Sequence, residues 1–247
     1  MNNKSVLFEQ IAHKFLNFID SCGRLNYYTR SKRLQGEKIK ECDEFIQEIK
    51  IYKAQAVKKC IEADANEFFL MQCVVNALRS SLSMWINLKN ESYQKSWSCL
   101  IDAQDYVCVG LKVRKYEGLL NIQKHLKSIE RAVFPGWVKY NSLGFVETVG
   151  NCSICGKKFI ECDHIENQIY LGSLCQRVDR KIIELNHSAL VENPRDRRCT
   201  INKISDDDGN MIDYYTWEKT GENKKYNEDE VGHMECALLT MSSLDVT

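Results

Sequence analysis

A stretch of 24 residues carries five side chains of types that bind metal ions, namely Cys152, Cys155, Cys162, His164 and Cys175. Thiolate sulfur and imidazole nitrogen are the usual zinc ligands, and a structural zinc ion takes four of them in a tetrahedron. The residue types therefore predict a metal site, with one donor more than the ion needs.

The first two cysteines belong to the sequence CSICG. Two thiolates three positions apart bind one ion when the chain turns tightly, and Gly156 gives the backbone the freedom to turn. The next run, KKFIECDHI, is rich in strand-forming residues. Residues two apart on a strand face the same side, so Cys162 and His164 are expected on one face, with Asp163 opposite. The two are then alternatives for one ligand position.

The last cysteine is predicted to lie at the start of a helix. Ser173 and Gln176 in SLCQRVDRKIIEL form a capping box, and apolar residues follow at helical spacing. The N-terminus of this helix would stabilise a thiolate at Cys175. Knuckle, strand and helix together predict a treble-clef-type module around a structural zinc ion. The favoured ligands are Cys152, Cys155, His164 and Cys175, with Cys162 as the alternative to His164.

The run CSICGKKFIECDHI resembles the start of HNH-type endonucleases, in which a CxxC pair precedes an Asp-His-Ile strand and the histidine activates water. This resemblance implies a metal-dependent nuclease that uses His164. In that family an asparagine and a further histidine or asparagine follow at separate positions, whereas Asn186 and His187 are adjacent in this chain. The nuclease is therefore an alternative to the structural metal site.

A second alternative is a ribonuclease. In RKIIELNH, six residues separate Arg180 from His187, and this spacing resembles the arginine and histidine pair of HEPN-type ribonucleases. The resemblance implies that the pair activates the 2′-hydroxyl of RNA in a dimeric site. That family carries the pair in its helical bundle, whereas in this chain it follows the cysteine cluster. Whether the protein is an enzyme is left open.

Basic residues gather around Pro194 and after the last cysteine of the cluster, and together they would form a patch for phosphate contacts. Acidic residues are interleaved, so the basic excess is only two and ordinary surface charge is the simpler interpretation. Nucleic acid is thus a second class of partner, through Arg177, Arg180, Lys181, Arg195, Arg197 and Arg198.

The composition favours a cytoplasmic protein with no membrane partner. Among the 247 residues, 34 basic side chains balance 34 acidic ones, so no net charge attracts nucleic acid or an anionic membrane. The most apolar stretch contains Gln72, Asn76 and Arg79, which excludes a membrane span. In a reducing compartment a disulfide framework is not expected. Most cysteines outside the cluster are interpreted as small core residues, at positions 22, 42, 60, 73, 99, 108 and 236.

Residues 1–134 are predicted to form a helical bundle that could hold a protein partner or a second copy of the chain. Neither glycine nor proline occurs between Gly36 and Gly110, and apolar residues recur at steps of three and four. The second helix has a period near 3.5 residues, with Lys53 as its polar break, which is typical of a coiled coil. Helices are expected over 7–22, from 37 onward, over 92–114, and over 119–133 before Pro135. The pattern that starts at 37 continues to Trp85 either as one helix or after a break near EADAN.

Residues 135–247 are predicted to form a small α+β zinc-binding domain, so the fold class is mainly α with this module after the bundle. Eight of the twelve glycines lie beyond Pro135. Strand-like runs occur at GFVETV, KKFIEC, NQIYLG, CTINKI and MIDYYTW, and DDDGN predicts a hairpin turn.

The pattern CSICG, then C-x-H-I, then a tyrosine and a glycine before a last cysteine resembles a small cysteine and histidine module of uncharacterised bacterial, phage and mobile-element proteins. The resemblance implies an accessory-genome protein, with phage defence or phage biology as its setting, and it names no reaction. The leading interpretation is a non-enzymatic, zinc-stabilised interaction or adaptor protein that binds a protein or nucleic acid.

Overall fold

The computed structural model describes residues 6–137, 139–224, 232–237 and 244–246. Helices fill the N-terminal part of the chain and short strands follow, so the predicted fold class is confirmed. The helices are α1 (Val6–Leu25), α2 (Lys32–Lys58), α3 (Glu62–Lys89), α4 (Tyr93–Val113) and α5 (Glu117–Val133).

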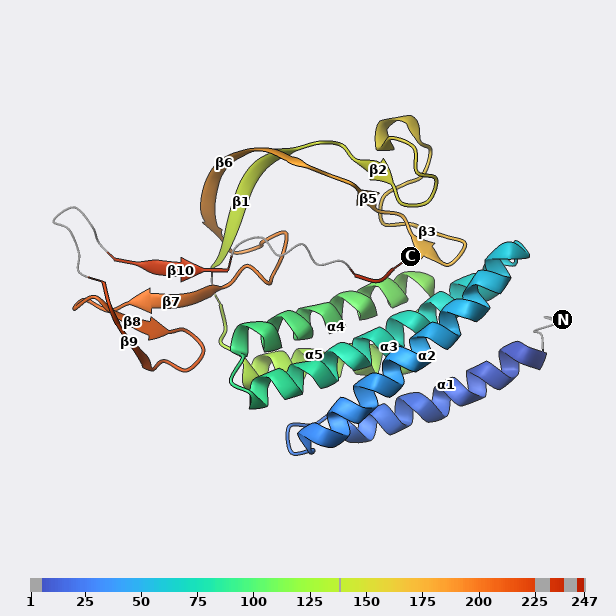
Figure 1. The fold of residues 1–247 in the computed structure, drawn as a ribbon, viewed down its shortest axis with the longest axis horizontal. Helices are drawn as coiled ribbons and strands as arrows, with labels where there is room; N and C mark the ends of the chain where they lie inside the picture. Colours follow the sequence, from blue (N-terminus) through green and yellow to red (C-terminus); the bar gives the residue numbers. More distant parts are fainter. Residues whose placement is uncertain (1–5, 138, 225–231, 238–243, 247) are drawn as a thin grey trace. The chain divides into compact units, whose positions relative to one another are not determined.

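Helix α3 is the centre of the bundle. It is buried over most of its length and packs against α2 and α4, and Figure 1 shows α1 to α4 side by side. On α2, the residues Cys42, Ile46, Ile49, Lys53 and Ala56 are buried at the predicted steps of three and four. The apolar face with a period near 3.5 residues thus packs against helices of the same chain. The break between the two helices lies just before EADAN.

The chain divides into two compact units. The first comprises Met1–Lys127, Val149–Arg180 and Leu244–Thr247, and the second comprises Ser128–Thr148 and Lys181–Ser243. The change from helices to strands lies near Pro135, where the sequence places the domain boundary. The compact units are nevertheless interleaved along the chain, because the cysteine-rich segment belongs to the same unit as the bundle.

The second unit contains two antiparallel sheets. Strand β1 (Tyr140–Glu147) pairs with β6 (Ile182–Val191). A sheet in the order β10-β7-β8-β9 is built from β7 (Ile201–Ser205), β8 (Asn210–Asp213), β9 (Lys219–Asn223) and β10 (Met234–Cys236). The DDDGN sequence forms the predicted hairpin turn between β7 and β8.

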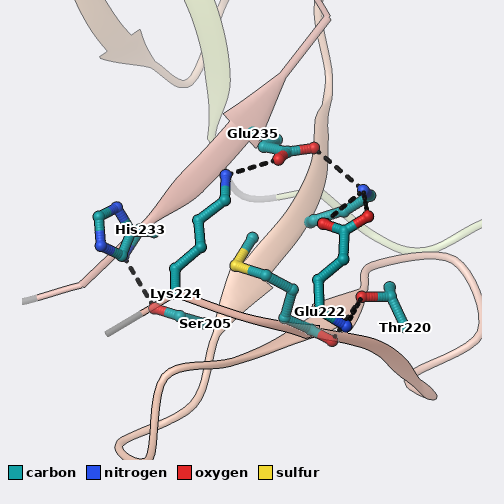
Figure 2. A network of polar contacts seen from close by, with 8 residues as sticks. Ser205, Thr220, Glu222, Lys224, His233 and Glu235 are labelled. Carbon is teal, nitrogen blue, oxygen red and sulfur yellow. Dashed lines mark hydrogen bonds and ion pairs between the residues drawn. The ribbon is translucent and has the colours of Figure 1, made fainter. Parts of the chain in front are cut away.

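Polar side chains join the strands of this four-stranded sheet. The Nζ atom of Lys203 lies 3.0 Å from a Glu222 oxygen and 3.2 Å from a Glu235 oxygen. Lys224 reaches the other Glu235 oxygen at 2.7 Å, as Figure 2 shows. The charges therefore alternate in sign across β7, β9 and β10, and each carboxylate has a cationic neighbour.

The cysteine-rich segment of the first unit consists of short hairpins. Strand β2 (Asn151–Cys152) pairs with β5 (Arg177–Val178), and β3 (Ile169–Tyr170) pairs with β4 (Ser173–Leu174). The only helical turn between residues 149 and 180, all of which the structure describes, is the short 3-10 helix η1 (Phe159–Glu161).

Two secondary-structure predictions in this segment are wrong. The helix predicted from Ser173 is absent, because the backbone there pairs with β3, β2 and β1 in turn, and this pairing outweighs the local helix signals. The strand predicted over KKFIEC is limited to a single bridge between Asn151 and Lys158, after which the chain turns in η1. With the helix absent, the treble-clef arrangement is not confirmed.

A glycine fixes the β3–β4 turn against α3. The amide of Gly172 donates a hydrogen bond of 2.8 Å to the side-chain oxygen of Asn66. Its φ of +73° is a left-handed conformation, and a Cβ atom there would lie 2.6 Å from the carbonyl oxygen of Ala65. Only glycine allows this close approach between the hairpin and the helix.

The cysteines outside the cluster are free thiols, in agreement with the prediction of no disulfide framework. Cys22, Cys42 and Cys73 are buried as predicted, whereas Cys60 and Cys108 are exposed, so the core interpretation is wrong for these two. No helix in the described part of the chain is long and apolar enough to cross a membrane.

Candidate metal centre

Four of the five predicted donors lie together. The ligand atoms of Cys152, Cys155, Cys162 and His164 are all within 4.8 Å of one another. The fifth donor is adjacent, since the sulfur of Cys175 lies 3.8 Å from that of Cys152. Two sulfurs bound to one tetrahedral zinc ion at about 2.3 Å are themselves about 3.8 Å apart. The four donor atoms of the cluster are therefore close enough to hold one ion, and the Cys175 sulfur also lies at a ligand-to-ligand distance from that of Cys152.

The CSICG sequence forms a tight knuckle. The amide of Cys152 donates to the carbonyl of Lys157 at 2.8 Å, and the amide of Gly156 donates to the carbonyl of Cys152 at 2.9 Å. Gly156 has the left-handed φ of +72° that the sequence predicts at this turn. The turn directs the amide of Ile154 toward the Cys152 sulfur at 3.4 Å.

Backbone amides of the knuckle lower the pKa of Cys152. Burial raises the pKa of Cys152, but hydrogen bonds from the amides of Cys155 and Ile154 outweigh it and lower this pKa to about 6. Backbone N–H groups stabilise the thiolate over the thiol. The lowered pKa of Cys152 favours the thiolate, which is the form of cysteine that binds metals.

His164 is positioned by a tyrosine. Its ring stands edge-on to the ring of Tyr170, with the centroids 4.6 Å apart and an angle of 89° between the planes. The Tyr170 hydroxyl accepts a hydrogen bond of 3.0 Å from the amide of Ile165. The Nδ1 atom of His164 is buried and has no hydrogen-bond partner among the described residues. A buried polar atom without a partner is costly, and a metal ion would satisfy it.

Cys162 and His164 are both part of the cluster, rather than being placed on one face of a strand. The 3-10 helix ends at Glu161, and Cys162 then takes an extended conformation with φ −116° and ψ 149°. The sulfur of Cys162 lies 3.8 Å from the carbonyl oxygen of His164. This bend brings two donors from neighbouring positions to one point.

Cys175 lies between β4 and β5 instead of at a helix end. It is fully buried, its amide donates to the carbonyl of Gln168, and its carbonyl accepts from the amide of Asn167, both at 2.8 Å. Burial raises its pKa to about 12, and the contact with Cys152 adds to this. The prediction that a helix N-terminus stabilises a thiolate at Cys175 is wrong, because no helix begins there. The Cys175 and Cys152 sulfurs are within hydrogen-bonding distance of each other at 3.8 Å.

Ser153 joins the knuckle to the chain around Cys175. Its amide donates to the carbonyl of Gln176 at 2.9 Å, and its hydroxyl accepts from the amide of Gln176 at the same distance. The hydroxyl also donates to the carbonyl of Leu174 at 3.2 Å. Sequence reasoning missed this role, because it assigned Gln176 to a capping box. The sequence signal for this role was Ser153 itself, a hydrogen-bonding residue between the two cysteines of the CxxC pair.

Of the residues that the two nuclease alternatives would use, only His164 and Arg180 belong to the same compact unit as the cluster. Asn186 and His187 are adjacent on the exposed strand β6, and Arg180 lies in the connection before it. Arg180 belongs to the first compact unit and His187 to the second. His164 alone among these residues lies in the metal cluster.

The predicted basic residues are largely paired with carboxylates. Arg177 contacts Glu166 at 3.2 Å, and Arg195 lies 3.9 Å from Glu147. Further ion pairs join Arg197 to Glu130 and the buried Arg198 to Asp196. Lys181 donates its backbone amide to the hydroxyl of Thr148.

No protein-family model, curated protein or solved structure matches this chain.

Proposed function

We propose that the protein binds one zinc ion through Cys152, Cys155, Cys162 and His164, and that this ion has a structural role. The observation that carries the proposal is the set of three thiols and one imidazole within 4.8 Å of one another. The buried Nδ1 atom of His164, which has no partner in the described part of the chain, supports it independently.

The donor chemistry favours zinc and a closed site. Thiolate and imidazole ligands suit zinc, whereas calcium and magnesium take oxygen ligands. Four protein donors fill a tetrahedron and leave no position open for a substrate or a reactive water. Cys175 would act from outside, by hydrogen bonding to the Cys152 sulfur at 3.8 Å, as residues behind metal ligands commonly do.

The segment 149–180 has few buried side chains, so its folded state needs an additional source of stability such as a metal ion. Between residues 149 and 180, all of which the structure describes, the buried residues are Cys152, Gly172, Leu174 and Cys175. Two of these four are cysteines: Cys152 is a donor of the cluster, and Cys175 is adjacent to it. So small a core cannot offset the entropy of ordering the segment, and small domains of this kind rely on metals or disulfides.

We further propose that the folded segment and the bundle form an interaction or adaptor protein in the cytoplasm. Free cysteines at all twelve positions suit a reducing compartment. The bundle is proposed as the surface for a protein partner or a second copy, and its exposed apolar side chains include Leu16 on α1 and Ile51 on α2. The setting in bacterial accessory systems, including phage defence, rests on the resemblance of the cysteine pattern alone.

Nuclease activity tests this proposal. The zinc-loaded protein is incubated with single- and double-stranded DNA and with RNA, in magnesium or manganese. We expect no cleavage above that of a Cys155→Ser preparation. Cleavage that His164→Ala abolishes, with zinc content and helicity retained, would replace the adaptor by the HNH-like alternative. Cleavage of RNA lost in Arg180→Ala or His187→Ala, but kept in His125→Ala, would favour the ribonuclease.

A further inference from the structure

Three helices of the bundle converge on one residue near the end of the chain, Asp245. The Nζ atom of Lys50 on α2 lies 2.7 Å from its carboxylate. The side-chain amide of Gln72 on α3 donates to its carbonyl at 3.1 Å. Its own amide donates to the hydroxyl of Tyr106 on α4 at 2.9 Å. The carboxylate, carbonyl and amide of one residue thus each contact a different helix.

The next residue is anchored beside the metal centre. The side chain of Val246 is fully buried, and its carbonyl accepts a hydrogen bond of 3.0 Å from the amide of Leu174 on β4. Its amide donates to the carbonyl of Leu244 at 2.9 Å. The segment Leu244–Val246, which we call the docked segment, therefore lies between the helices and the β4 hairpin of the same unit.

The site that holds the docked segment is built of buried polar side chains. Gln72 is fully buried, and its side-chain oxygen accepts a hydrogen bond of 2.8 Å from Lys53, which is itself buried. Lys53 thereby fixes the orientation of the Gln72 amide, so that its N–H groups point to the docked segment. Tyr106 is only 7% exposed. Buried polar groups of this kind need a partner, and the docked segment supplies it.

We propose that this seat, formed by Lys50, Gln72, Tyr106 and Leu174, is a recognition site for a short peptide with an acidic residue followed by an aliphatic one, and that the chain's own docked segment occupies it. Two seat contacts are to the peptide backbone of Asp245 and one is to that of Val246. Specificity comes from the ion pair with Lys50 and from the buried Val246 side chain. Backbone pairing combined with side-chain selection is a common mode of peptide recognition.

The docked segment competes with a partner peptide of the same chemistry. Its covalent attachment gives it a high effective concentration at the seat, so an added peptide binds the intact chain weakly. A change that releases the segment opens the seat. Three of the four seat residues, Lys50, Gln72 and Tyr106, lie on helices, whereas Leu174 belongs to the segment 149–180 that the proposed zinc ion stabilises, so the peptide titrations use zinc-loaded protein.

The test uses the full chain with the substitutions Asp245→Ala and Val246→Asp, which remove the ion pair and the apolar anchor. A fluorescent peptide of residues 240–247 is titrated into this released variant and into the wild type. We expect the released variant to bind at least about tenfold more tightly, because the wild-type segment occupies the seat. Equal binding to both chains, or no binding to a released variant with unchanged helicity, would overturn the proposal.

Exchanging the charges of Lys50 and Asp245 distinguishes a loss of peptide recognition from a loss of folding. Lys50→Glu in the released variant should weaken the peptide by about tenfold or more, since it replaces an ion pair by a repulsion. A peptide carrying Asp245→Lys should bind Lys50→Glu better than the original peptide does. The proposal fails if both peptides bind both seats equally.

A second measurement uses the wild-type seat. With a fluorophore attached at position 247, an excess of unlabelled peptide should displace the docked segment and lower the fluorescence anisotropy. A peptide carrying Val246→Asp should leave the anisotropy unchanged. Failure of the original peptide to lower it at millimolar concentration would contradict an exchangeable site.

Discussion

The sulfur atoms of Cys152 and Cys175 lie 3.8 Å apart, although 23 positions separate the two residues in sequence. The strand pair β2–β5 produces this contact, because Cys152 pairs with Arg177 and thereby places Cys175 next to the knuckle. In the zinc site that we propose, this contact accounts for the fifth donor, because a tetrahedral ion needs only four. The fifth is available as a hydrogen-bond donor to a ligand instead of as a ligand.

Single substitutions distinguish the ligands from the outer cysteine. Cys162→Ser should lose zinc, because the hydroxyl is a far weaker zinc ligand than a thiolate. Cys175→Ser should keep about one zinc per chain, with affinity lowered roughly 10-fold to 100-fold, as expected for a residue behind the ligands. Zinc content and competition with a chromogenic chelator measure both effects.

The reverse result has a clear meaning. If Cys175→Ser abolishes zinc binding while Cys162→Ser preserves it, the ligands are Cys152, Cys155, His164 and Cys175, the set that the sequence alone favoured. The site would remain a zinc site, but Cys175 would be a ligand rather than a hydrogen-bond donor behind one.

Lys53 should make stability rise with pH in the alkaline range. Burial, with a smaller contribution from Lys50, lowers its pKa from 10.5 to about 8. Between these two values the unfolded chain holds the proton and the folded chain does not, so the free energy of unfolding increases with pH. Relative to Lys53→Met, the wild type should gain about 2 kcal/mol between pH 8 and 9.5.

Urea unfolding at several pH values measures this difference. The exposed Lys59 serves as the control, and the curves of Lys59→Met and wild type should stay parallel. Parallel curves for Lys53→Met and wild type would show that Lys53 is charged in the folded protein up to its ordinary pKa.

Gly172 should tolerate no side chain. Gly172→Ala places a Cβ atom 2.6 Å from the backbone oxygen of Ala65 at a φ of +73°, and it should cost about 2 kcal/mol or more of stability. Gly36→Ala on α2, where nothing lies within 4 Å, should instead stabilise by about 0.5–1 kcal/mol. Thermal unfolding of both variants measures the contrast, and a neutral Gly172→Ala would mean that the β3–β4 turn is not held against α3 as described.

The sequence predicted the features whose signals are local. The apolar stripe from Cys42 to Ala56 predicted the buried face of α2, and CSICG predicted the turn at Gly156. The capping box at Ser173 was equally local but misleading, because the chain from Ser173 to Val191 pairs with β3 just before it and with β2 and β1, which begin more than twenty residues earlier.

The docked segment was invisible to sequence reasoning for a related physical reason. Three residues have no periodicity, and the partners of Asp245 lie 139 to 195 positions away in the chain. The position of Cys175 likewise depends on a strand pair of two residues, which no local pattern reveals.

Zinc content per chain is the most direct test of the metal site. Protein purified without added metal should contain about one zinc ion per chain, and a chelator should unfold residues 149–180 while the helices remain. Cys155→Ser should bring the content near zero, and the exposed Cys60, substituted as Cys60→Ser, should leave it unchanged. A metal-free wild-type protein whose residues 149–180 stay ordered and protected from proteolysis would contradict a structural zinc site.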